Sequence, residues 1–155
     1  MNLSNVKLVV SDMDGTLLNS KGKVSNLFFD LFEQLQKQNI IFCAASGRQY
    51  NSIVHKLAPI KDKIYVIAEN GGIAKKGEEV LVLNSLSSDK IKTLIPVLRT
   101  IEGANIVLCG KNCAFIESKN TEFIALFQEY YSSYKIVSDL LAIADSEEYL
   151  KIAIY

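Results

Sequence analysis

The sequence predicts a protein of the α/β class that changes character near its middle. In the first 72 residues, short apolar runs alternate with segments of helical periodicity, a pattern typical of parallel strands joined by right-handed crossovers. After residue 72, paired strand-like runs around turns replace this alternation, which is typical of an α+β region. We therefore expect a parallel-sheet domain over residues 1–76 and an α+β domain over residues 77–155.

Three apolar runs predict the strands of the first part. They cover residues 6–10, 40–45 and 64–68, and the first is so nearly all apolar that we expect a buried strand. Polar or glycine residues follow each run directly. Because ligands of open α/β sheets bind beyond the carboxyl ends of the strands, we expect these three polar segments to meet at one edge of the sheet.

Two helices are predicted between these strands. Ser25 can cap the first, whose apolar side chains recur at helical spacings up to residue 35. The second covers residues 49–57 and precedes Pro59. His55 is the single histidine and has no visible catalytic partner, so we interpret it as structural.

The second part is predicted to mix hairpins with two further helices. Hairpins are expected around turns at residues 76–78 and 110–112, helices over residues 87–98 and 121–131, and a strand over residues 150–155. Pro96 could interrupt the first of these helices. Residues 136–144 favour neither helix nor strand.

The composition excludes several classes of protein. Of 155 residues, 49% are hydrophobic and 22% are charged, which is typical of a globular chain. Lys plus Arg equal Asp plus Glu at 17 each, so the net charge is zero. It gives no indication of binding to nucleic acid or to an anionic membrane. No apolar run is long enough for a membrane span, no secretion signal is visible, and the three cysteines fit reduced thiols. We expect a cytoplasmic protein.

The segment Asp12-Met13-Asp14-Gly15-Thr16, directly after the first predicted strand, carries the clearest chemistry. Paired carboxylates favour a hard divalent cation, Mg²⁺ above all, and aspartate can act as a covalent nucleophile toward phosphorus. If extended geometry continued through the motif, both carboxylates would point to the same side. Gly15 permits a turn whose N–H groups can hold phosphate oxygens. The alternative is a plain Asp- and Gly-rich turn after a strand.

Two weaker segments follow the next strands. Ser46-Gly47-Arg48 offers a hydroxyl and backbone N–H groups at a helix start, which can bind a phosphoryl group. Ser46 could instead only cap the next helix. Asn70 opens an Asn-Gly-Gly segment after the third strand, and most such sequences are plain turns.

Together these three segments resemble the haloacid dehalogenase-like phosphatases, and most of all the Cof-type branch, which includes many sugar-phosphate phosphatases. The resemblance implies a Rossmann-like, three-layer parallel core, here its N-terminal part, and a partial α+β cap domain. It also implies that Asp12 is the nucleophile and a Mg²⁺ ligand. Asp14 would be the general acid and then the general base, and its backbone carbonyl would also reach Mg²⁺.

The resemblance assigns the remaining residues to the phosphate and the substrate. Ser46 stands where the family usually has Thr and keeps the hydroxyl that would bind the phosphoryl group. Backbone N–H groups of Gly47, Gly15 and Thr16 would complete the phosphate site. Arg48 and Asn70 would line the mouth between core and cap. The implied substrate is a small phosphorylated metabolite.

The sequence departs from the family pattern after Asn70. The family also needs a Lys and a later acidic Gly-Asp-type motif for the metal, and no later segment matches them; the acidic residues 145–148 are interpreted as a loop. We therefore expect the N-terminal part of a longer protein, poorly active alone or self-associating through exposed apolar surface. The alternatives are an inactive fragment and a non-catalytic interaction or phosphate-binding module.

Overall fold

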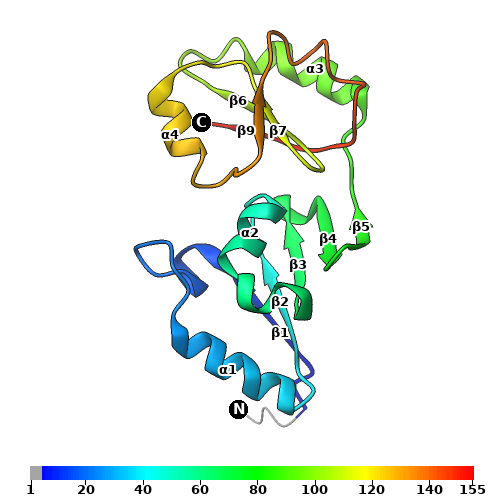
Figure 1. Cartoon of the computed structure of the whole chain (residues 1–155). Helices are drawn as coiled ribbons and strands as arrows, with labels where there is room; N and C mark the ends of the chain where they lie inside the picture. Colours follow the sequence, from blue (N-terminus) through cyan, green and yellow to red (C-terminus); the bar gives the residue numbers. More distant parts are fainter. Residues whose placement is uncertain (1–4) are drawn as a thin grey trace. The chain divides into compact units, whose positions relative to one another are not determined.

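The computed structural model describes residues 5–155, and the chain divides into two compact units, residues 1–82 and 83–155 (Figure 1). The predicted domain boundary between residues 76 and 77 falls in the turn of the last hairpin of the first unit, between β4 (Ile73–Lys76) and β5 (Glu79–Leu83). Both strands of that hairpin belong to the sheet of the first unit.

The first unit is built on a five-stranded sheet of order β1-β2-β3-β4-β5. Its first three strands are parallel, and β4 runs antiparallel to β3. This arrangement confirms the α/β class and the parallel pairing predicted from the alternation. The three parallel strands are β1 (Leu8–Asp12), β2 (Ile41–Ala45) and β3 (Tyr65–Ala68).

The first strand differs from the prediction in position and in burial. It begins two residues later than expected and includes Asp12. The expected burial is wrong, since the side chains of Leu8 and Val10 are each 53% exposed. The physical reason is topological: β1 is an edge strand of the described sheet, and these alternate side chains fall on a face that no described helix covers.

One face of this sheet is covered by α1 (Asn26–Lys37) and α2 (Tyr50–Lys56). Consecutive right-handed crossovers in one direction place both helices on the same side. Phe42, on that face, is 3% exposed and lies 5.0 Å from the ring of Phe28. Ile41, on the opposite face, is 45% exposed. The described residues thus form the sheet and one helical layer of the expected three-layer core.

The start of α1 follows the predicted capping. The Ser25 hydroxyl accepts a hydrogen bond from the Phe28 N–H at 3.3 Å, which satisfies one of the free donors of the first turn. From there the apolar stripe packs on the sheet, and Phe32 is 2% exposed. Between α2 and β3, residues Ala58–Lys63 form a 3₁₀ segment that begins just before Pro59.

The second unit is α+β, as predicted. Its four-stranded sheet has the order β8-β7-β6-β9, in which β6 is antiparallel to β7 and β9, and β7 is parallel to β8. α3 (Ser88–Leu98) packs in one buried cluster and α4 (Thr121–Phe127) in another, on alternate residues of β6. The strands are β6 (Ile106–Gly110), β7 (Ala114–Ile116), β8 (Tyr134–Ile136) and β9 (Tyr149–Ile154).

Several predicted ends shift in this unit. α3 continues two residues past Pro96, which lies in the last turn. α4 ends at Phe127, and Tyr131 instead packs flat against the Phe127 ring at 4.6 Å. Of the ambiguous stretch, only residue 136 lies in a strand. None of the described helices is both long enough and apolar enough to cross a membrane.

Candidate active site

A π-helical turn, Met13–Leu17, carries the second aspartate of the motif. Met13 is fully buried and anchors the turn, and the Leu18 N–H donates to the Met13 carbonyl at 2.8 Å. Inside the turn, Asp14 is extended (φ −77°, ψ 123°) and Gly15 has φ 71°, a conformation that favours glycine. The regular strand geometry assumed for the two carboxylates therefore stops at Asp12.

Asp12 is the last residue of β1 and is exposed at the carboxyl end of the sheet. It lies in register with Ala45, the last residue of the neighbouring strand β2. The Ser11 hydroxyl donates to the Asp12 backbone carbonyl at 2.9 Å. The backbone of Asp12 is thus held by the sheet while its carboxylate faces solvent.

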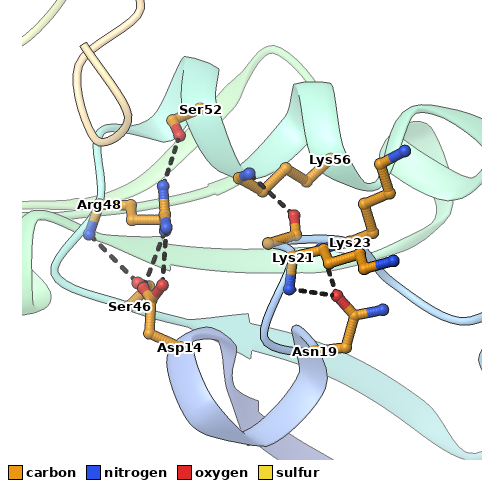
Figure 2. Close-up of polar contacts among 9 residues, drawn as sticks. Asp14, Asn19, Lys21, Lys23, Ser46, Arg48, Ser52 and Lys56 are labelled. Atoms are coloured by element: carbon orange, nitrogen blue, oxygen red, sulfur yellow. Dashed lines mark hydrogen bonds and ion pairs between the residues drawn. The ribbon is translucent and has the colours of Figure 1, made fainter. Parts of the chain in front are cut away.

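Asp14 is held by Arg48 in a two-pronged ion pair (Figure 2). The guanidinium donates from Nε to Oδ2 at 2.8 Å and from Nη2 to Oδ1 at 2.6 Å. The Arg48 side chain is 3% exposed, whereas that of Asp14 is 44% exposed. Parallel, charge-assisted hydrogen bonds of this kind fix the orientation of a carboxylate. Arg48, expected at the mouth of the site, is instead buried beside the predicted acid–base residue.

Ser46 begins the turn that follows β2. Its hydroxyl accepts a hydrogen bond from the Arg48 N–H at 3.2 Å. Ser46 is not the N-cap of the next helix, because Gln49 occupies that position and α2 begins at Tyr50. The hydroxyl therefore shapes the turn itself, and its own proton is left to donate to another group.

The segment after β3 closes onto this turn. The Asn70 N–H donates to the Ser46 carbonyl at 3.2 Å, and the Glu69 N–H donates to the Arg48 carbonyl at 3.1 Å. A Cβ atom on Gly47 would lie 2.6 Å from Asn70 Oδ1, so a larger residue at this position would require the Asn70 side chain to move. These contacts confirm that the three strand ends meet at one edge. Thr16 lies exposed in the turn of the first.

Three features of the site were missed from sequence. Ser52 accepts a hydrogen bond from Arg48 Nη1 at 3.5 Å, and no helical spacing indicated it, because Arg48 precedes the N-cap of α2. Glu69 is 3% exposed and, like Asn70, has a positive φ, a costly backbone conformation that no sequence pattern indicated. Tyr50 donates to the Gly77 carbonyl at 2.8 Å, and burial, followed by the nearby carboxylates of Glu78 and Asp62, raises its pKa.

Few groups at the candidate active site could bind a metal ion. No group of three or more His, Cys, Asp or Glu side chains in the described part of the chain is arranged to hold an ion. Both carboxylate oxygens of Asp14 are engaged by Arg48. What remains is the exposed Asp12 carboxylate and the Asp14 backbone carbonyl. These oxygens fit Mg²⁺, which proteins commonly bind through one or two carboxylates, with waters and substrate phosphate completing the shell.

Comparison with known proteins identifies the family. The family model for haloacid dehalogenase-like hydrolases matches residues 9–155. The chain belongs to the haloacid dehalogenase-like hydrolase family. It is 33% identical over 128 residues to the Escherichia coli (strain K12) 5-amino-6-(5-phospho-D-ribitylamino)uracil phosphatase YbjI, covering 81% of this chain and 47% of that protein. It is also 35% identical over 68 residues to the phosphatase YwpJ of Bacillus subtilis (strain 168), covering 44% of this chain and 24% of that protein.

A solved structure shares the fold of this chain. The crystal structure of SMU.1108c from Streptococcus mutans UA159 superposes with a TM-score of 0.87 at 23% identity, covering 97% of this chain and 57% of that one. The chain thus spans about half the length of its curated Escherichia coli relative and somewhat more than half of this structural one. The match confirms the Rossmann-like α/β architecture of this haloacid dehalogenase-like chain.

Proposed function

We propose that this haloacid dehalogenase-like chain carries the phosphoryl-transfer residues of a Mg²⁺-dependent phosphomonoester hydrolase. The observation that supports it most is the Asp14–Arg48 ion pair, because it fixes a second carboxylate two residues after an exposed aspartate at the sheet edge. Relatives named as phosphatases support the reaction class. The substrate would be a small phosphorylated metabolite, such as a sugar phosphate, and the intermediate an aspartyl-phosphate.

The first chemical step would use both aspartates. A carboxylate oxygen of Asp12 attacks phosphorus and forms the O–P bond, while the bond from phosphorus to the leaving oxygen breaks. Asp14 gives a proton to that oxygen as it leaves. To carry this proton, Asp14 must exchange one of its two hydrogen bonds to Arg48 for a bond to the substrate.

The second step would release phosphate. Asp14, now a carboxylate, takes a proton from a water molecule that attacks the phosphorus, and the bond to Asp12 breaks. The two-pronged contact with Arg48 would form again between the two steps, while Asp14 is charged, and one of its hydrogen bonds would have to break when Asp14 takes the proton from water. A bound Mg²⁺, held by the Asp12 carboxylate and the Asp14 carbonyl, would neutralise charge on the phosphoryl oxygens.

The phosphate would be held by donors from two of the converging turns. The Ser46 hydroxyl proton is available because its oxygen already accepts from the Arg48 N–H. N–H groups of Gly15, Thr16 and Gly47 would add backbone donors. Asn70, whose side chain lies close to Gly47, would be on the substrate side of this cradle.

Turnover of p-nitrophenyl phosphate with Mg²⁺ tests the proposal. Asp12→Asn should lower kcat by roughly 10³-fold or more, since nothing else in the proposed site can form the covalent intermediate. The matched control is Asp30→Asn, an exposed aspartate on α1, which should leave turnover unchanged. Measurable turnover that is equal for wild type and Asp12→Asn would overturn the nucleophile assignment.

A second candidate is a phosphate-binding module without hydrolysis. The small metal donor set of the described residues favours it. In that case tungstate, a phosphate mimic, would bind to the wild-type chain and more weakly to a variant that lacks the Ser46 hydroxyl. p-Nitrophenyl phosphate would not be hydrolysed. Asp12-dependent turnover excludes this candidate.

A further inference from the structure

The polar turn at residues 19–24 is a separately ordered feature of the first unit. The Asn19 side-chain oxygen accepts hydrogen bonds from the N–H groups of Lys21 at 2.9 Å and Lys23 at 3.1 Å. The Gly22 N–H donates to the Asn19 carbonyl at 2.8 Å, and Gly22 has φ 65°. Backbone and side-chain bonds thus fix this turn although it is exposed.

A contact with α2 ties this turn to the helix. Lys56 Nζ donates to the Gly22 carbonyl at 3.0 Å (Figure 2). Between the turn and the helix lies an open cavity of about 400 Å³. Lys21, Lys23 and Lys56 line it together with His55 and the partly buried Phe29. In Figure 2 the side chains of Lys21 and Lys23 extend away from the Asp14–Arg48 pair.

The charge of this cavity is strongly one-sided. Three lysines line it, and no Asp or Glu belongs to its described lining. Within the described part of the chain, Lys21 and Lys23 form no ion pair with a carboxylate. The chain as a whole has no net charge, so this concentration of positive charge is local. Like charges gathered on a fixed turn repel one another, and a bound anion would relieve that repulsion.

We propose that this cavity, which we call the lysine cavity, is a second anion site that binds a di- or triphosphate group. Lysine ammonium groups act as compact charges without a planar geometry, which suits tetrahedral phosphates. Several of them within one cavity favour a multiply charged ligand over a single phosphate. The volume lies within the range of small-ligand pockets. The ligand is inorganic pyrophosphate or the polyphosphate end of a nucleotide, whose base could pack on Phe29.

The lysine cavity is distinct from the proposed active site. None of its lining residues belongs to the strand ends that carry Asp12, Ser46 and Asn70. It is nevertheless connected to the aspartate turn. Leu18, which closes that turn, forms an isolated antiparallel β-bridge with Val24. Because the cavity and the proposed active site share no residues, binding in the cavity can be measured independently of phosphatase activity.

Titration of the ¹⁵N-labelled full chain with inorganic pyrophosphate tests the proposal in metal-free buffer at constant ionic strength. We expect amide shifts at residues 19–24 and 55–56, and weaker binding of inorganic phosphate. The double variant Lys21→Gln/Lys23→Gln should bind pyrophosphate at least about tenfold more weakly, since it removes two of three lining charges. The matched control, Lys61→Gln/Lys90→Gln, loses the same charge at exposed positions outside the cavity and should bind as wild type.

The outcomes separate the ligand sources. Equal affinities for pyrophosphate and ATP indicate recognition of the phosphates alone, and tighter ATP binding that weakens in Phe29→Ala indicates a nucleotide. The proposal is overturned by unchanged affinity in Lys21→Gln/Lys23→Gln, by shifts confined to residues 12–16 and 46–48, or by no binding at millimolar pyrophosphate. Asp12→Asn should bind pyrophosphate normally, so a failed phosphatase assay does not decide this result.

Discussion

Arg48 and Asp14 lie 34 residues apart in the chain and form a two-pronged ion pair in which only the carboxylate reaches solvent. The pair joins the turn after β1 to the turn after β2. It makes the position of the proposed acid–base residue depend on a buried guanidinium, and the consequences for stability can be measured directly.

Replacing Arg48 by Lys tests the geometry of this pair. Lysine keeps the charge but cannot make two parallel hydrogen bonds. We expect Arg48→Lys to lower the free energy of unfolding by about 1–3 kcal/mol, as measured by urea denaturation. Ser52→Ala, which removes only the 3.5 Å contact to Nη1, should cost less than about 1 kcal/mol. Wild-type stability of Arg48→Lys would show that the pair contributes little.

Gly47 and Asn70 should be energetically coupled. Gly47→Ala places a methyl group 2.6 Å from Asn70 Oδ1, so the Asn70 side chain must move, and we expect a loss of about 1–3 kcal/mol in unfolding free energy. Asn70→Gly removes that side chain and tolerates the positive φ of 56°. The double variant Gly47→Ala/Asn70→Gly should have an unfolding free energy less than about 1 kcal/mol below that of Asn70→Gly alone. Additive effects in this cycle would contradict the contact.

In the second unit, the contact between Arg99 and Asp139 should make the stability of the fold depend on pH. Arg99 Nη2 donates to Asp139 Oδ1 at 2.6 Å, and this bond, helped by the Leu141 N–H, holds the pKa of Asp139 below its ordinary value. An acid whose pKa is lowered by folding stabilises the fold above its unfolded-state pKa, and the contribution is lost as pH falls through the folded-state pKa.

We therefore expect wild type to lose more stability than Asp139→Asn between about pH 5 and about pH 2. Urea midpoints measured across this range give the comparison. Parallel curves for the two proteins would mean that the Arg99 contact does not favour the charged form of Asp139.

The uncovered sheet face predicts self-association. Leu8, Val10 and Ile41 are each at least 45% exposed there, and Leu8 and Ile41 also line an apolar hollow of about 280 Å³. We expect the mass from light scattering to rise with protein concentration, and Ile41→Lys to suppress the rise. Leu126→Lys, at a position on α4 that is 69% exposed, is the control and should behave as wild type. A monomer at every concentration would refute this expectation.

Much of the fold followed from patterns that report local structure. The alternation of apolar runs with helical periodicity predicted the parallel strands, and the meeting of Asp14, Arg48 and Asn70 followed because parallel strands share one carboxyl edge. The burial of β1 was wrongly predicted, because an apolar run looks the same whether one face of the sheet or both are covered by helices. The Asp14–Arg48 pair could not be predicted, because it depends on the backbone angles of the turn after Asp12.

The edge position of β1 has a consequence for heat inactivation. Edge strands have hydrogen-bonded neighbours on one side only, so they detach at a lower free energy than the strands inside a sheet. Asp12 ends this strand. Fraying of β1 would therefore remove the proposed nucleophile while the remaining strands stay folded, and any activity would fade at temperatures below the main melting transition.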